Sequence, residues 1–160
     1  MQKVPITKPG FDKLKKELDN LKKVAVPENI RQIEAARAHG DISENAEYEA
    51  AKEQQSFIQG KIQEIENKLA TSEIIDHNDL TDERVVFGST VVLEDTIKGE
   101  TAEYVLVGPY ESDIDRNKIS VTSPIGKALI GREVGDTVTV KTPGGVRKFE
   151  IADIAIKPHT

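Results

Sequence analysis

RAHGDISENAEY, residues 37–48, lies between two long helical patterns. A stretch in this position is expected to form the turn of a helical hairpin. Gly40 suits the left-handed residue that ends the first helix, and Asp41 followed by Glu44 is a capping-box arrangement for the second. The turn of a long hairpin is the part of a protein farthest from its own core. Asp41 and Glu44 therefore either cap a helix or are placed there for chemistry elsewhere.

Two patterns with alternating steps of three and four residues predict the arms of a coiled-coil hairpin. In the first arm the predicted seam is Phe11, Leu14, Leu18, Leu21, Val24 or Ala25, Ile30, Ile33 and Ala36 or Arg37. In the second arm it is Ala46, Ala50, Gln54, Phe57 or Ile58, Ile62, Ile65 and Leu69. Thr7 is the expected N-cap of the first helix, and Pro27 is expected to kink that helix. Small seam residues near the turn predict a slim tip.

After residue 77 the period of the sequence changes from that of a helix to that of a strand. Residues 71–84 are polar and rich in acids, which predicts a linker around 76–82. Strands are expected at residues 85–87, 90–93, 102–107, 118–122, 137–140 and 148–156, with one short helix at 123–131. The predicted fold class is α+β. An antiparallel coiled-coil hairpin, with an acidic tip at 39–47, spans residues 1–76, and a small, mostly antiparallel β-sheet domain spans 77–160.

The composition limits the class of protein. The chain has 160 residues, of which 31% are charged, and its formal net charge is −6. This charge argues against general binding to the phosphate backbone of nucleic acids. The absence of cysteine excludes disulfides and thiolate metal sites and fits a cytoplasmic protein. No apolar run is long enough to cross a bilayer, so no membrane partner is expected.

The acids of the turn have two interpretations. Acids are favoured at a helix N-terminus, where they accept hydrogen bonds from free N–H groups, and spacing alone favours this structural role. Magnesium prefers six oxygen ligands, so Asp41 and Glu44 are too few to hold it by themselves. A catalytic role therefore requires a partner that supplies the remaining ligands. A slim rod with acids at its end is suited to entering such a partner.

Two cations, Arg37 and Lys52, flank the tip on the two arms. They either form ordinary surface ion pairs, for example with Asp41 and Glu49, or make a small cationic spot that contacts a phosphate. The sequence leaves both interpretations open.

Two parts of the sequence resemble the signatures of the bacterial Gre transcript-cleavage factors. The first is EAARAHGDISENAEY at 34–48, continued by AAKEQQ at 50–55. The second is SPIGKALIGR at 123–132 with GD at 135–136 and TPGG at 142–145. The resemblance covers essentially the whole chain in the same order. The modest number of cations near the tip favours the branch of this family with the smaller basic patch.

The resemblance implies an FKBP-like fold for the C-terminal domain, which docks at the rim of the secondary channel of RNA polymerase. It implies an elongation factor that is not itself an enzyme but stimulates the polymerase to cleave backtracked nascent RNA. Asp41 and Glu44 then hold a Mg²⁺ ion shared with the polymerase, none being bound by the factor alone. Arg37 and Lys52 contact the extruded RNA 3′ end. The factor is expected to act as a monomer.

Other functions remain as alternatives. An inhibitor could enter the same channel without activating cleavage, although Asp41 and Glu44 speak against this. A peptidyl-prolyl isomerase needs an apolar, aromatic-lined pocket, and the C-terminal half has few aromatic residues. A coiled-coil adaptor would do no chemistry and would not depend on Asp41. Residues 110–116 and 123–131 are the candidates for contact with polymerase.

Overall fold

The computed structural model describes residues 3–39, 42–75 and 82–156, and the side chains of these residues outside 39–45. The chain forms two compact units, Phe11–Thr71 and a second one made of Met1–Gly10 with Ser72–Thr160. This division differs from the predicted one, because the first ten residues join the C-terminal unit. The cause is a parallel pair of short strands, β1 (Val4–Ile6) with β2 (Ser72–Ile74). The predicted linker at 76–82 lies mostly outside the described residues.

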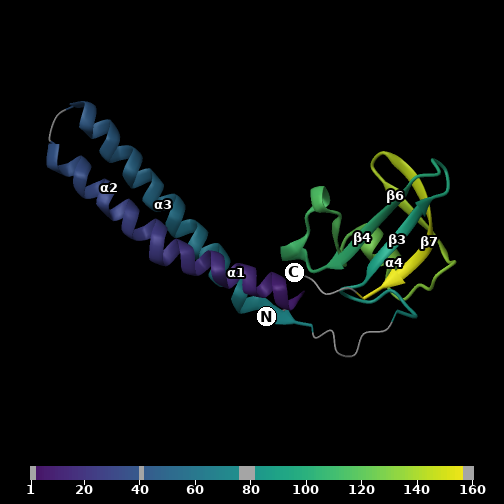
Figure 1. The fold of residues 1–160 in the computed structure, drawn as a ribbon. Coiled ribbons are helices and arrows are strands. Elements are labelled where there is room, and N and C mark those ends of the chain that lie inside the picture. Colours follow the sequence, from purple (N-terminus) through teal and green to yellow (C-terminus); the bar gives the residue numbers. More distant parts are fainter. Residues whose placement is uncertain (1–2, 40–41, 76–81, 157–160) are drawn as a thin grey trace. The chain divides into compact units, whose positions relative to one another are not determined.

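The hairpin unit is built from long helices (Figure 1). The first arm consists of α1 (Lys8–Asn20), a five-residue π-helical turn η1 (Leu21–Ala25) and α2 (Val26–His39). The second arm is α3 (Ile42–Thr71). Thr7 caps the first arm as predicted, because its Oγ1 accepts a hydrogen bond of 3.1 Å from the backbone N–H of Gly10. The sequence therefore predicted both arms.

Pro27 disturbs the first arm by widening a turn. The N–H of Val26 donates to the carbonyl of Leu21, five residues back, and the helix then continues through Pro27. Proline has no N–H to donate, and a π turn is one way in which a helix accommodates such a break. The disturbance was predicted, but its form was not.

The seam of the hairpin follows the prediction in the half remote from the tip, where Ile58, Ile62 and Ile65 are buried. Toward the tip the prediction was wrong by one or two residues. Ala51 is buried and Tyr48 is half-buried, whereas Ala46 and Ala50 are exposed. The steps of three and four that run through Ile65, Ile62 and Ile58 continue to Gln55, Ala51 and Tyr48. This regular spacing, and not the most apolar residues, sets the contact face.

Asn29 replaces the predicted Ile30 in the first arm. Asn29 is 4% exposed, whereas Ile30 is 45% exposed. The π turn adds about one residue to its turn, which shifts the phase of the seam and turns Asn29 inward. The Asn29 Nδ2 donates a hydrogen bond of 3.0 Å to the backbone carbonyl of Ala51 on the other arm. A buried polar side chain of this kind fixes the register of two helices.

The C-terminal unit contains a five-stranded sheet in the order β5-β4-β3-β7-β6 (Figure 1). Its strands are β3 (Thr90–Asp95), β4 (Thr101–Val107), β5 (Lys118–Ser120), β6 (Thr137–Thr142) and β7 (Gly145–Ala155). The sheet is mixed and not purely antiparallel, because β5 pairs in parallel with β4. The strand predicted at 85–87 does not form, although Val85 is fully buried in the core.

The short helix predicted at 123–131 is present as α4 (Pro124–Leu129). Ser123 caps it, since its Oγ accepts a hydrogen bond of 3.1 Å from the N–H of Gly126. Gly131 follows the helix with a φ of 84°, a conformation that favours glycine. Leu129 is fully buried and packs α4 onto the core that Val91, Leu106 and other strand residues form.

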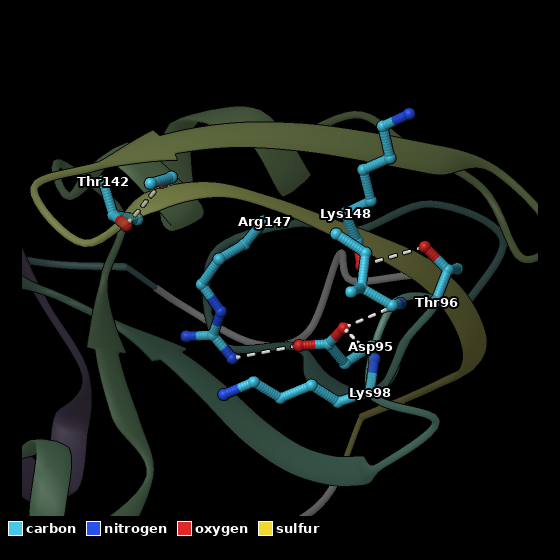
Figure 2. Close-up of polar contacts among 8 residues, drawn as sticks. Asp95, Thr96, Lys98, Thr142, Arg147 and Lys148 are labelled. Carbon is cyan, nitrogen blue, oxygen red and sulfur yellow. Dashed lines mark hydrogen bonds and ion pairs between the residues drawn. The ribbon is translucent and has the colours of Figure 1, made fainter.

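Asp95 closes the turn between β3 and β4 (Figure 2). Its Oδ1 accepts hydrogen bonds from the N–H groups of Ile97 and Lys98, at 2.9 and 3.0 Å, and its Oδ2 lies 3.6 Å from Arg147 Nη2. The N–H of Lys98, then that of Ile97 and the Arg147 charge, lower the pKa of the Asp95 carboxyl despite the opposing effect of burial. Arg147 also stacks over the ring of Phe149, 4.7 Å from its centroid.

Replacing Asp95 by asparagine is expected to lower the stability of the C-terminal unit at pH 7. Because the folded-state pKa is lowered, the carboxylate stabilises the fold above its unfolded-state pKa of about 3.9. That contribution is lost as the pH falls through the folded-state pKa. Urea unfolding between pH 7 and pH 3 should therefore show a gap between wild type and variant that closes on acidification. Asp153→Asn, on the exposed face of β7, is the control, and an equally large, pH-independent loss in both variants would contradict the assignment.

Candidate functional site

The structure describes only part of the two tip acids. Asp41 lies outside the described residues. Glu44 lies in the first turn of α3, which begins at Ile42, and its side chain is outside the described part. The start of α3 agrees with the predicted start of the second helix near residues 41–43. The capping and metal-binding roles of Asp41 and Glu44 remain predictions.

Arg37 and Tyr48 form a contact between the two arms next to the tip. Arg37 is exposed on α2, and its guanidinium carbon lies 6.0 Å from the centroid of the Tyr48 ring on α3. A cation at this distance from an aromatic face is attracted to it. Tyr48 thus lies against the opposite arm at the narrow end of the hairpin. The contact restricts the Arg37 side chain and keeps its charge close to the tip.

Lys52 lies one helical turn beyond Tyr48 on α3. Its Nζ donates a hydrogen bond of 2.8 Å to the side-chain oxygen of Gln55, and the side chain is exposed. Among the described residues, Lys52 does not form the ion pair with Glu49 that was one predicted possibility. No contact joins Lys52 to Arg37 in the described part of the chain. The two cations therefore flank the tip separately, one on each arm.

A shallow groove runs between the arms near the tip, with a volume of about 570 Å³. Its lining is rich in alanine and consists of Gln32, Ala35, Ala36, Glu47, Ala50, Ala51 and Gln54. Small side chains let two helices approach closely and leave little bulk outside them. The predicted slimness of the hairpin near its tip is consistent with this lining.

The remaining described residues offer few other sites. Among the described side chains, which exclude those of residues 39–45, no three His, Asp or Glu residues could jointly hold a metal ion. The helices that the structure describes include none with the length and apolarity needed to span a membrane.

Two family models match the chain in succession. The N-terminal model of the GreA and GreB transcription elongation factors matches residues 4–74, and the C-terminal GreA/GreB model matches residues 80–156. The chain belongs to the GreA/GreB family of transcription elongation factors. The two matched segments cover nearly all of the hairpin and of the β-sheet domain, so the membership applies to the whole chain. The resemblance found in the sequence is confirmed.

Several relatives carry the name transcription elongation factor GreA. The GreA of Syntrophus aciditrophicus (strain SB) is 63% identical over 99% of this chain and 98% of its own length. The GreA of Anaeromyxobacter sp. (strain K) is 53% identical over 97% of this chain and 93% of its own. Among solved structures, the GreA factor homolog 1 (Gfh1) of Thermus thermophilus is 31% identical, with a TM-score of 0.45, and covers 96% of this chain and 99% of its own.

Proposed function

We propose that this elongation factor binds RNA polymerase at its secondary channel and stimulates the polymerase's own cleavage of backtracked nascent RNA. The observation that carries the proposal is membership of the GreA/GreB family across both units of the chain. A long hairpin with a slim tip is a shape that can enter a channel of another protein. The factor itself is not the catalyst in this proposal, because it supplies only part of a metal site.

Asp41 and Glu44 are the residues proposed to complete the metal site of the polymerase. Their carboxylates are hard oxygen donors, which fit Mg²⁺ in chemical type but are too few for its usual six ligands. When bound, Mg²⁺ supplies an activated water and neutralises charge on the phosphodiester under attack. The chain's own contribution in this proposal is to supply the two carboxylates at the tip of the hairpin, where α3 begins at Ile42.

Arg37 and Lys52 are proposed to contact phosphates of the extruded RNA 3′ end. The attraction between Arg37 and the Tyr48 ring supports this role, because it keeps the guanidinium close to the tip while its N–H groups can still donate. Lys52 adds a point charge on the other arm. A simple surface ion pair between Lys52 and Glu49 is the less favoured interpretation, since Lys52 bonds to Gln55.

The segment at 123–131 is the better supported of the two candidate docking segments in the C-terminal unit. Lys127 and Ile130 of this segment line an apolar hollow of about 470 Å³, together with Pro5, Ile75, Phe87 and Val121. A half-exposed apolar surface of this kind suits contact with another protein. Phe87 is the only aromatic residue in the lining, which disfavours the isomerase alternative.

The proposal is tested by adding the full-length factor to purified elongation complexes that have been backtracked by a defined number of nucleotides. We expect the RNA to be shortened from its 3′ end faster than by polymerase alone, followed by renewed elongation from the new end. Binding of the factor is measured separately in the same complexes. Binding without any increase in cleavage would identify a channel inhibitor instead.

A further inference from the structure

The C-terminal unit carries two strongly exposed apolar side chains. Ile114 is 84% exposed and Ile97 is 67% exposed, more than any other large apolar residue that the structure describes. Ile97 lies in the turn between β3 and β4, and Ile114 lies in a short 3-10 helix before β5, η4 (Ile114–Arg116). A contact that covers both side chains would remove apolar surface from water, which is favourable.

Ile97 borders a hollow of about 360 Å³ in the C-terminal unit. Residues of two turns line this hollow, the turn that follows β3 and the turn between β6 and β7. Val146, from the second turn, forms another apolar wall and is 51% exposed. The hollow therefore offers two aliphatic side chains between which a third one can be buried.

The same hollow carries an unbalanced positive charge. Lys98 and Arg147 both line it, and their charged ends lie on the same side of Asp95 (Figure 2). The Asp95 carboxylate lies 3.6 Å from Arg147 and offsets one of the two positive charges. Among the residues that the structure describes, no acid pairs with the Lys98 ammonium. The lining is therefore suited to one further carboxylate next to an aliphatic group.

The segment around Ile114 has the complementary chemistry. Asp113 and Asp115 stand on either side of Ile114 in the sequence. Asp113 is paired with Arg116 at 3.7 Å, whereas Asp115 is exposed and pairs with no cation in the described part of the chain. Ile114 and Asp115 thus present, side by side in the sequence, an aliphatic side chain and a carboxylate.

The hollow and the Ile114 segment do not meet within one molecule. Both belong to the same compact unit, and within this unit Ile97 and Ile114 are each largely exposed. A contact between them therefore requires two molecules. Every copy of the chain carries both features, so the complementary segment is always present at the same concentration as the hollow.

We propose that the hollow binds the Ile114–Asp115 segment of a second copy of this chain. Ile114 of one copy enters between the two apolar walls, and Asp115 faces the two cations. The contact joins two different surfaces, so it is head-to-tail and extends into short chains unless the rotation closes a ring. Since few residues take part, we expect a dissociation constant of about 0.5 mM. The inference concerns the free factor and does not rest on the proposed function.

Sedimentation velocity of the full-length factor without polymerase tests the association. Wild type should be monomeric at about 10 µM and increasingly associated toward about 1 mM. Added salt should weaken the association, because the charges at the rim of the hollow are partly exposed to solvent. A wild-type factor that stays monomeric over this range would overturn the proposal and leave the hollow to a different partner.

Ile114→Ser and Ile97→Ser each remove one half of the apolar contact. Both side chains are exposed, so the fold should persist, and circular dichroism checks this. Each variant alone should associate at least about tenfold more weakly than wild type. Val134→Ser, at a 53% exposed position before β6, is the matched control and should associate like wild type. If either isoleucine variant associates like wild type, the contact lies elsewhere and the proposal is wrong.

Mixing the two isoleucine variants separates a head-to-tail contact from a symmetric one. The Ile114→Ser chain keeps its hollow, and the Ile97→Ser chain keeps its Ile114, so the mixture contains one complete contact. We expect a 1:1 complex of nearly wild-type affinity that does not grow further. A mixture that sediments like its separate components would refute the head-to-tail contact.

The charged part of the contact is tested by exchanging the two signs. Lys98→Glu and Asp115→Lys should each weaken association by about tenfold, because like charges then face each other. An equal mixture of these two variants should recover association, since opposite charges meet again. Lys148→Glu is the control, because the Lys148 side chain points away from Arg147 in Figure 2. Single variants that associate like wild type, or a mixture without recovery, would contradict the proposed pairing.

Discussion

Replacing Asp41 by asparagine is expected to reduce factor-stimulated RNA cleavage by about 100-fold or more, since a metal ligand contributes several kcal/mol to the transition state. Asparagine can still cap a helix, so the start of α3 should persist. A neutral amide oxygen is a much poorer ligand for Mg²⁺ than a carboxylate. The rate is measured in a single turnover at saturating factor.

Asp19→Asn is the control for the change of charge. Asp19 is exposed on α1 and pairs with Lys23 on the surface at 3.1 Å, so its replacement should leave cleavage unchanged. Binding of each variant to the backtracked complex is measured by competition with labelled wild type. Equal binding together with undiminished cleavage by Asp41→Asn would leave Asp41 as a helix cap only.

Replacing Asn29 by aspartate is expected to destabilise the hairpin by about 3 kcal/mol at pH 7, the cost of a buried and uncompensated charge. The new carboxylate has the shape of the amide but cannot donate to the Ala51 carbonyl as the Asn29 Nδ2 does. Two oxygens would face each other at this place. Thermal unfolding followed by the helical circular dichroism signal reports on the hairpin, which contains the long helices.

The same variant should regain stability in acid. Burial raises the pKa of a carboxyl group in the folded state, so the folded protein takes up the proton more readily than the unfolded chain. The loss of stability is then present at high pH and disappears as the pH falls through the raised pKa, because the protonated carboxyl group can again donate a hydrogen bond to the Ala51 carbonyl. Asn20→Asp, exposed on α1, is the matched control. If both variants lose the same stability at every pH, the Asn29 hydrogen bond does not set the register.

The overall design of the hairpin could be predicted because its heptad spacing repeats over many turns. The individual contacts near the tip could not be predicted, because alanines occupy several neighbouring positions. Whether Ala50 or Ala51 faces the other arm depends on the phase of the whole helix. Asn29 was missed because apolarity favours Ile30. The deciding factor was the π turn before Pro27, whose effect on the phase has no signal in the local sequence.

In the C-terminal unit the longer strands and α4 carried clear patterns. β1 and β2 have three residues each, too few for a periodic signal. The strand predicted at 118–122 forms as β5, but its parallel direction depends on the path of the chain before it and could not be predicted. The hydrogen bond that the N–H of Thr7 donates to the Glu111 carboxylate joins segments 104 residues apart and has no local signature in the sequence. At the tip the prediction located Arg37, Lys52 and Tyr48 correctly near the turn, but it did not identify Tyr48 as the partner of Arg37.

The Mg²⁺ dependence of cleavage tests most directly whether the tip carboxylates complete the metal site of the polymerase. Backtracked complexes are titrated with Mg²⁺ in the presence of saturating wild type, of Asp41→Asn, or without factor. Wild type should lower the Mg²⁺ concentration needed for half of the maximal rate, whereas Asp41→Asn should require as much as polymerase alone. Identical Mg²⁺ requirements for wild type and Asp41→Asn would contradict the proposal that the tip carboxylates bind the metal ion.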